Sequence, residues 1–198
     1  MVLNKQLITE VMKTKKYFTV SLFLTIGLFL IIQNSYSQNI KPDRQERKEV
    51  RQAQRAANFY VLDSLLNARS FVLVADYLRN PYGVMVPVTS TINFIRIDGP
   101  TGVIQTGSDF SRGYNGVGGV TAEGSIGNWE VIKDAKRLTH RIRFSIFSNI
   151  GHYDVSMVVG SDNRASATVS GLWRGRLTWD GYLETIGNSR VFKGQNTI

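Results

Sequence analysis

The sequence predicts a mainly β protein: an antiparallel meander of eight or nine strands, barrel-like or a sandwich, preceded by one N-terminal α-helix. Beyond residue 69, apolar and polar side chains alternate with a period of two along short segments. Clusters of glycine, asparagine and aspartate separate these segments, as turns do. No helical pattern lies between them, which excludes a repeated βαβ fold. The 198 residues include no cysteine, so the core must hold the fold without disulfides.

Residues 1–37 have the features of a secretory signal peptide. Three lysines within residues 13–16 precede an apolar run over residues 17–32, and the small residues Ser35 and Ser37 suit cleavage after Ser37. The apolar run is shorter than the roughly 20 residues of a membrane-spanning helix. We therefore expect cleavage, with an uncleaved anchor as the alternative.

Met12 is a second candidate for the true start, because Met12-Lys-Thr-Lys-Lys is a compact positive region by itself. Cleavage would leave a periplasmic or secreted protein with no stable membrane span. A lipid anchor is not expected, since there is no cysteine to carry it.

Residues 38–69 predict the N-terminal helix, whose first half is solvated. Residues 43–49 are polar on all sides, and the acidic residues among the arginines and lysines are typical of a solvated helix face. No nucleic-acid partner is expected, because no recognition motif accompanies these charges. The second half has one apolar face, expected to dock on the β-domain and formed by Val50, Ala53, Ala56, Phe59, Leu62 and Leu66.

Residues 70–198 predict the antiparallel β-domain. Its first expected strands cover residues 71–78, 88–97, 103–106, 120–126 and 129–133. Turn signals separate them at Asn80-Pro81-Tyr82-Gly83, Asp98-Gly99-Pro100 and Gly127-Asn128.

Residues 99–127 hold nine of the eighteen glycines and centre on the run from Gly113 to Val120. This run lacks the spacing of a dinucleotide fingerprint and the Lys-Ser/Thr of a P-loop, and β-like sequence follows it. We therefore interpret these glycines as residues that link strands and permit turns, and we expect no nucleotide or other cofactor.

Side-chain alternation predicts two consecutive hairpins over residues 138–169. In the first, the expected cross-strand pairs are Ile146 with Val155, Phe144 with Met157, and Ile142 with Val159. The second turns at Ser161-Asp162-Asn163, with Asn163 in a left-handed conformation, and pairs Val159 with Ala165, Met157 with Ala167, and Val155 with Val169. Further on, Asp180-Gly181 predicts a hairpin that places Trp179 opposite Leu183.

Several segments resemble those of one protein family. They are Ser70-Phe-Val-Leu-Val-Ala-Asp-Tyr77, Ser90-Thr-Ile-Asn-Phe94, Gly113-Tyr-Asn-Gly-Val-Gly-Gly119, Ser148-Asn-Ile-Gly151, Ala165-Ser-Ala-Thr-Val-Ser-Gly171 and Arg190-Val-Phe-Lys-Gly194. In these the chain is similar to Domain of Unknown Function 4251. The resemblance implies an exported bacterial protein of the cell envelope and assigns no activity.

The candidate ligand-binding residues are Tyr114, Asn115, Trp129, Tyr153 and Trp173. Aromatic side chains at a barrel mouth can bind a small apolar molecule, and Tyr114 and Asn115 lie in a glycine-rich loop, where binding residues are common. The competing interpretation is that the aromatics belong to the core and its rim. The leading prediction is thus a non-enzymatic exported domain that binds a small apolar ligand or an envelope component.

Two alternatives remain open from the sequence. A hydrolase could use His152 and Asp154 with Ser148 or Ser156, although the chain has no Gly-x-Ser-x-Gly motif. A small outer-membrane barrel is the other, since eight strands suffice for one. No catalytic residue and no metal site are predicted. His140 and His152, the only histidines, fall at opposite ends of the expected hairpin and cannot share a metal ion within one chain.

Overall fold

The computed structural model describes residues 43–109, 113, 115–172 and 175–197. The chain forms two units, Met1–Lys48 and Glu49–Ile198. Of the first unit only residues 43–48 are described, and residues 44–48 are the start of helix α2 (Arg44–Ala68). All of the strands belong to the second unit.

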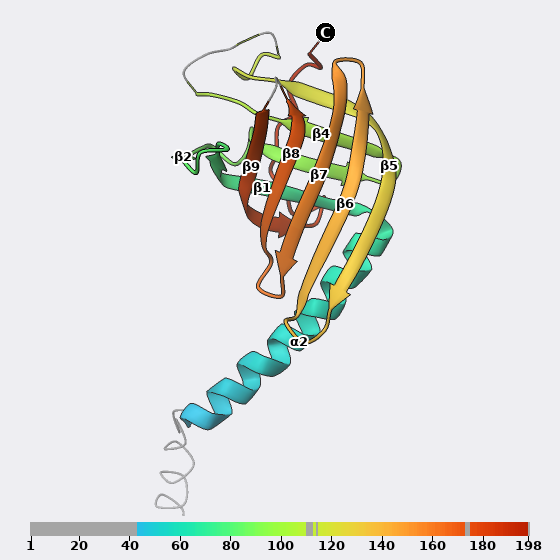
Figure 1. Cartoon of the computed structure of the whole chain (residues 1–198). Coiled ribbons are helices and arrows are strands. Elements are labelled where there is room, and N and C mark those ends of the chain that lie inside the picture. Colours follow the sequence, from blue (N-terminus) through green and yellow to red (C-terminus); the bar gives the residue numbers. More distant parts are fainter. Residues whose placement is uncertain (1–42, 110–112, 114, 173–174, 198) are drawn as a thin grey trace, which may run out of the picture. The chain divides into compact units, whose positions relative to one another are not determined.

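Eight antiparallel strands close into a barrel (Figure 1). They are β1 (Ser70–Arg79), β3 (Phe94–Asp98), β4 (Thr101–Gln105), β5 (Thr121–Asp134), β6 (Thr139–Ser148), β7 (Gly151–Gly160), β8 (Arg164–Leu172) and β9 (Gly175–Glu184). Each pairs with the next in this order, and β9 pairs with β1 to complete the circle. The short strand β2 (Met85–Pro87) adds to the end of β1. The predicted mainly β class is confirmed, and the sheet is a closed barrel.

Apolar side chains fill the inside of the barrel. The largest of the fully buried ones on the strands are Trp179, Phe71, Leu73, Ile95, Ile97, Ile104, Ile142, Ile146 and Met157. Helix α2 adds Phe59, Leu62 and Leu66 from its second half. Val50 and Ala53, which we expected on the same docked face, are exposed. Each large apolar side chain buried here contributes roughly 1.5–3 kcal/mol.

The β6–β7 hairpin keeps the predicted faces but not the predicted register. Ile146 lies opposite Tyr153 rather than Val155, so all of the expected pairs are displaced by two residues. The cause is a tighter turn, in which only Asn149 and Ile150 separate the strands. A displacement by two residues leaves every side chain on its own side of the sheet, which is why the inward positions were still correct.

The β7–β8 hairpin forms as predicted, with Val155 opposite Val169, Met157 opposite Ala167 and Val159 opposite Ala165. Its turn residue Asn163 has a φ of 64°. This left-handed conformation is one that asparagine tolerates better than most residues.

Two predicted breaks in the sheet do not occur. The expected strands 120–126 and 129–133 are one bulged strand, β5, in which Asn128 takes a positive φ of 54°. The predicted hairpin at Asp180-Gly181 is wrong, since β9 runs straight through this dipeptide. Gly181 instead permits a close approach to β1, where an added Cβ would lie 2.0 Å from the carbonyl oxygen of Val74.

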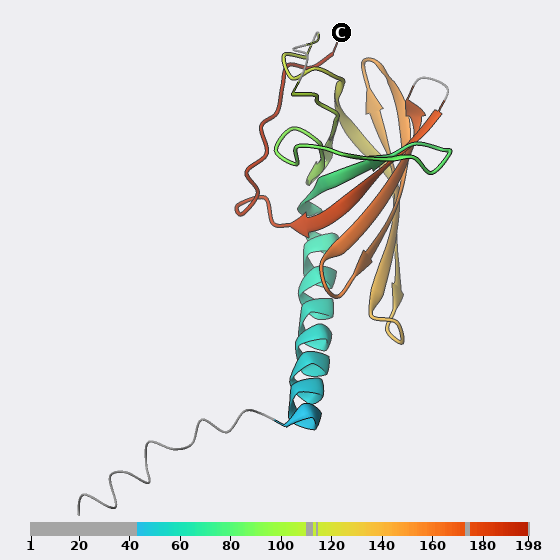
Figure 2. The same ribbon diagram turned by 90° about the vertical axis from the view of Figure 1, so that its left-hand side faces the viewer.

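The glycine-rich run belongs to the loop that links β4 to β5, as predicted. Gly113, Gly116 and Gly118 have φ values of 51°, 77° and 80°, which glycine adopts without strain. After β9, residues 185–197 form a C-terminal tail that runs along the outside of the barrel (Figure 2). Ile186 and Val191 of this tail pack against a small outer cluster on β1, β3 and β4, formed by Val72, Phe94 and Val103.

The side chain of Gln105, at the end of β4, joins the barrel to this tail. Its Nε2 donates to the carbonyl oxygens of Ile92 (3.0 Å) and Phe192 (2.9 Å). Its Oε1 accepts from the hydroxyl of Thr121 (3.0 Å) and the backbone N–H of Gly194 (2.8 Å). The side chain is fully buried, and the two bonds that its Oε1 accepts are buried as well.

Replacing Gln105 by leucine is expected to destabilise the domain. The change would leave two buried donors and two partly buried acceptors without their partner, and should lower the free energy of unfolding by about 3 kcal/mol. Urea unfolding measures this loss. The matched control is Gln195→Leu at an exposed tail position, which should change stability little. Equal effects of the two changes would contradict the assigned role of Gln105.

His140 lies where helix α2 meets the barrel. Its side chain is fully buried, and its ring stacks on Phe59 with the ring centres 4.4 Å apart. Its Nε2 is 3.5 Å from Asp63 Oδ1, which is longer than an ordinary hydrogen bond, and neither ring nitrogen has a hydrogen-bond partner among the described residues. Burial lowers the pKa of His140, while the carboxylate of Asp63 opposes this shift.

Lys133 of β5 donates to Asp63 Oδ2 at 2.8 Å. This contact lowers the pKa of Asp63 below 3.8 and keeps the carboxylate ionised. Lys133 also disfavours a proton on His140. The junction of helix and barrel therefore contains a neutral imidazole beside an ion pair.

The domain is expected to lose stability as the pH falls below about 6.5. The pKa of His140 is 6.5 in the unfolded chain and lower in the folded protein. Between these two pKa values the unfolded state binds more protons than the folded state, so the free energy of unfolding decreases as the pH falls. A His140→Phe variant should remove this dependence between pH 5 and 8 and keep the stacking on Phe59. The measurement is urea unfolding across this range. His152→Phe, at an exposed histidine, is the control, and its free energy of unfolding should depend on pH as that of the wild type does. If His140→Phe kept the wild-type pH dependence, His140 would not be its source.

Candidate functional site

Asn115 is a structural residue of the glycine-rich loop rather than a ligand-facing one. It is fully buried. Its Oδ1 accepts from the backbone N–H groups of Val117 (3.1 Å) and Gly119 (3.0 Å), and its Nδ2 donates to Thr121 Oγ1 (3.0 Å). The side chain thus shapes the loop and fixes it to β5.

Tyr153 belongs to the core of the barrel, and Trp129 packs against that core from its rim. Both positions fit the competing interpretation of these aromatic residues. Tyr153 points into the barrel and is only 3% exposed, and burial raises the pKa of its hydroxyl. Trp129 is half-buried. Its ring centre lies 5.1 Å from that of Phe144, and the guanidinium carbon of Arg69 lies 5.0 Å from the centre of the Trp129 ring. Tyr114 and Trp173 lie outside the described residues. Of the three candidates that the structure describes, Asn115 and Tyr153 are buried and Trp129 is half-buried.

His152 and Asp154 lie in contact, but not as parts of a catalytic triad. His152 Nε2 is 3.1 Å from Asp154 Oδ1, and Ser145 donates to that same oxygen at 2.7 Å. In a triad the serine contacts the histidine, which in turn contacts the carboxylate. Ser148, one of the two nucleophiles considered, instead donates to the carbonyl of Gly151.

Metal binding and membrane insertion were also considered. His140 and His152 lie at opposite ends of the β6–β7 hairpin. Within the part of the chain that the structure describes, no three potential metal-ligating side chains gather. In that same part, no helix combines the length and the apolar character needed to cross a membrane.

A hollow of about 480 Å³ lies on the outer surface of strands β5 to β9, and we call it the polar hollow. Its lining is dominated by polar side chains that face away from the barrel core: Asn128, Glu130, Arg143, Ser145, Asp154, Ser156, Thr168, Ser170 and Arg176.

The strand register arranges these side chains in two rows across the barrel. The first row consists of successive cross-strand partners from β5 to β1, namely Glu130, Arg143, Ser156, Thr168, Thr178 and Arg79. The second, one step along the strands, consists of Ser145, Asp154, Ser170 and Arg176. In the first row hydroxyl groups occupy the middle and charged groups flank them, whereas in the second row hydroxyl and charged groups alternate.

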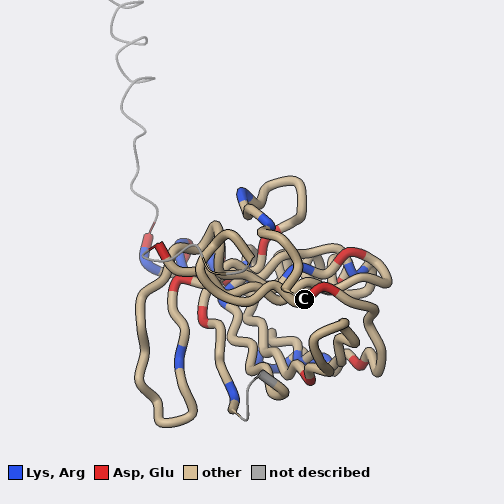
Figure 3. Tube along the Cα trace, turned by 90° about the horizontal axis from the view of Figure 1, so that it is seen from above, with Lys and Arg blue, Asp and Glu red and all other residues tan. Residues whose placement is uncertain are grey.

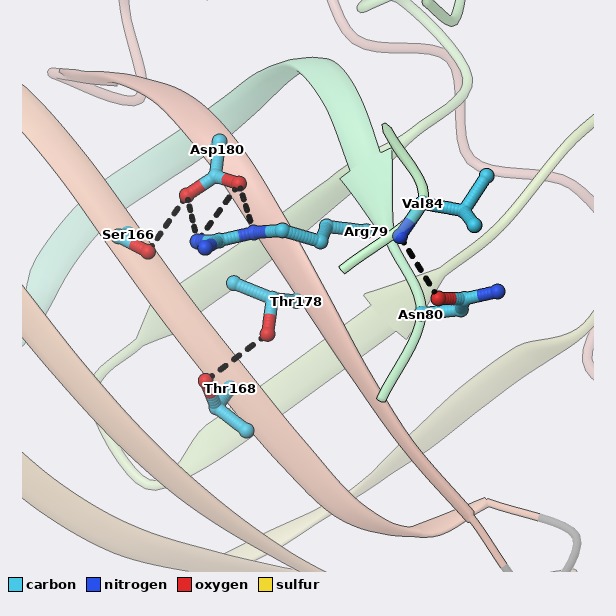
Figure 4. A network of polar contacts seen from close by, with 7 residues as sticks. All are labelled: Arg79, Asn80, Val84, Ser166, Thr168, Thr178 and Asp180. Carbon is cyan, nitrogen blue, oxygen red and sulfur yellow. Dashed lines mark hydrogen bonds and ion pairs between the residues drawn. The ribbon is translucent and has the colours of Figure 1, made fainter. Parts of the chain in front are cut away.

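A second hollow of about 240 Å³ adjoins the first and shares Thr168 and Arg176 with it. Several side chains in and beside this second hollow are paired with one another (Figure 4). Arg79 makes two 3.0 Å contacts to Asp180, whose Oδ1 also accepts from Ser166. The hydroxyls of Thr168 and Thr178 are 2.9 Å apart. This network holds the β9–β1 side of the polar hollow in a fixed arrangement.

Charge in the polar hollow is balanced, but its members are not all paired. Asp154 accepts hydrogen bonds, whereas Arg143, Arg176 and Glu130 have no ion-pair partner within 4 Å among the described residues. Along the trace as a whole, basic and acidic positions are interspersed (Figure 3). Unpaired arginines beside exposed hydroxyls can bind a carboxylate or phosphate with several hydrogen bonds.

The sequence analysis did not identify this hollow. Its signal is present in the alternation of β6, where Arg143 and Ser145 occupy outward positions, and in the serines and threonines of β8. Placing these outward residues beside one another required the register of four consecutive hairpins, and the register assumed for β6–β7 was displaced by two residues.

The chain matches the family model "Domain of unknown function (DUF4251)" over residues 53–183. It is also similar to the crystal structure of a DUF4251 family protein from Bacteroides eggerthii, with 28% sequence identity and a TM-score of 0.59. That similarity covers 71% of this chain and 96% of the other. No protein with a curated description matches. Sequence and fold agree, and the chain therefore belongs to the DUF4251 family, whose function is unknown.

Proposed function

We propose that this chain is an exported, non-enzymatic domain that binds a polar component of the cell envelope in the polar hollow. Export is inferred from the signal-like residues 1–37. The observation that carries the binding proposal is the unbroken row of outward polar side chains from Glu130 to Arg79, which crosses six strands. A hollow with convergent polar groups on a rigid sheet is the usual setting of a binding site.

The proposal favours a polar ligand over the apolar one expected from the sequence. The inside of the barrel, where an apolar molecule would bind, is occupied by the packed core side chains. The candidate Tyr153 is part of this core. By contrast, the polar hollow offers serine, threonine and charged side chains to solvent, and these lose little by exchanging water for a ligand's polar groups.

The two alternatives from the sequence receive less support from the same surface. A hydrolase would need a nucleophile bonded to His152, whereas Ser145 is bonded to Asp154. An outer-membrane barrel presents an apolar band to lipid, and charged groups on that face are costly. The outward rows here contain Glu130, Arg143, Asp154 and Arg176.

Native mass spectrometry tests the proposal on the protein exported from its full-length gene. We expect a retained molecule, seen as excess mass that disappears on unfolding. Thr168→Tyr should abolish this mass, because a tyrosine at the centre of the hollow would fill it. Tyrosine suits strands as well as threonine does, so the barrel should still fold.

Thr139→Tyr is the matched control, since it makes the same change on β6 outside the polar hollow. It should leave the excess mass unchanged. The proposal fails if the wild-type protein carries no molecule, or if Thr168→Tyr, folded by circular dichroism, retains it as well as the control does.

A further inference from the structure

Resting on the proposed binding role of the polar hollow, we infer the chemical class of its ligand. We propose a small molecule that carries hydroxyl groups and a carboxylate or phosphate, with the anionic group held by Arg143 and Arg176. A sugar acid and a sugar phosphate both have this chemistry.

Arg143 and Arg176 differ from other arginines on the barrel in having no acidic partner among the described residues. Arg79 and Arg96 each lie within 3.0 Å of an aspartate oxygen, from Asp180 and Asp98 respectively. Arg143 and Arg176 line the polar hollow and have no such partner within 4 Å among the described residues. A guanidinium presents its N–H groups in a fork that matches the oxygens of a carboxylate or phosphate.

Asp154, the acidic residue of the second row, is already engaged by other side chains. Asp154 accepts from Ser145 at 2.7 Å and lies 3.1 Å from His152 Nε2. Its contacts run toward β6 and the start of β7, whereas Arg176 lies on β9. Arg176 is therefore available to an external anion.

Hydroxyl groups lie between the two arginines. Arg143 is on β6 and Arg176 on β9, one row further along, so three strand spacings (about 14 Å) across and two residues (about 7 Å) along, roughly 16 Å in all, separate their backbones. Ser156, Thr168 and Ser170 occupy the interval. Two long side chains thus reach over a floor of hydroxyls, which can donate to the anion or bond to the ligand's own hydroxyl groups.

The acidic residues limit the ligand to few negative charges. Glu130 is the cross-strand partner of Arg143, and with Asp154 it balances the charge of the two arginines. A polyanion would be repelled by both carboxylates, whereas a molecule with one anionic group can face the arginines and offer hydroxyl donors to Glu130.

The experiment follows the arginine side-chain Nε–Hε signals by NMR in the ¹⁵N-labelled exported protein. The probes are inorganic phosphate, glucuronate and glucose, at constant ionic strength. We expect phosphate or glucuronate to shift the signals of Arg143 and Arg176, and glucose to leave them unchanged. Whether phosphate or glucuronate binds more tightly distinguishes the two sources of the anionic group.

Arg143→Gln and Arg176→Gln should each weaken binding of the better probe about tenfold, as expected for loss of charge-assisted hydrogen bonds. Arg141→Gln, on the same strand outside the hollow, is the matched control and should not change it. The inference is overturned if no probe shifts the two signals, if Arg141 shifts equally, or if the variants bind as the wild type does.

These outcomes are distinguishable from failure of the binding proposal itself. If Thr168→Tyr loses the retained molecule while a double Arg143→Gln, Arg176→Gln variant keeps it, the hollow binds a neutral ligand, and only the anionic class is wrong. If neither variant changes retention, the ligand binds elsewhere, and both proposals fail.

Discussion

The fully satisfied amide of Gln105 is the contact through which the outer parts of this domain are joined to its barrel. The chain segments that meet there are distant in sequence: Ile92 precedes β3, Thr121 begins β5, and Phe192 and Gly194 belong to the C-terminal tail. The adjacent Asn115 shapes the glycine-rich loop in the same way. Burying two amides is favourable only because nearly all of their hydrogen-bonding capacity is used. The hydrogen bonds of Gln105 and Asn115 thus hold the described part of the loop in one conformation.

The barrel separates two kinds of surface by simple alternation. Inward positions form one apolar core to which helix α2 contributes Leu62 and Leu66, so the interior serves stability. Outward positions on β5 to β9 carry hydroxyl and charged groups. The closely packed core beneath them keeps the strands rigid and so fixes the spacing of these groups. A site built on strands differs in this respect from the loop site expected around Tyr114 and Asn115. The structured sheet, rather than the loop, presents the candidate binding groups.

The sequence predicted the fold class and most inward positions because alternation is a local property, readable within one strand. Asn163 and the β7–β8 pairs were correct for this reason. The length of the turn after Ser148 and the continuity of β9 through Gly181 were not predictable, since both depend on neighbouring strands. Gly181 resembles a turn residue in sequence, yet its role is to let β1 approach. The polar hollow escaped prediction because it exists only when several registers are combined.

The pairing of β1 with β9 has a consequence for how the molecule is made. The first long strand finds its partner only about a hundred residues later, as in the pairs Leu73 with Leu183 and Val72 with Glu184. Such non-local pairing makes folding slow, because a long loop must close before its contacts form. A nascent chain therefore cannot close its barrel until β9 has been synthesised, and until then the hydrogen-bonding edge of β1 lacks this partner.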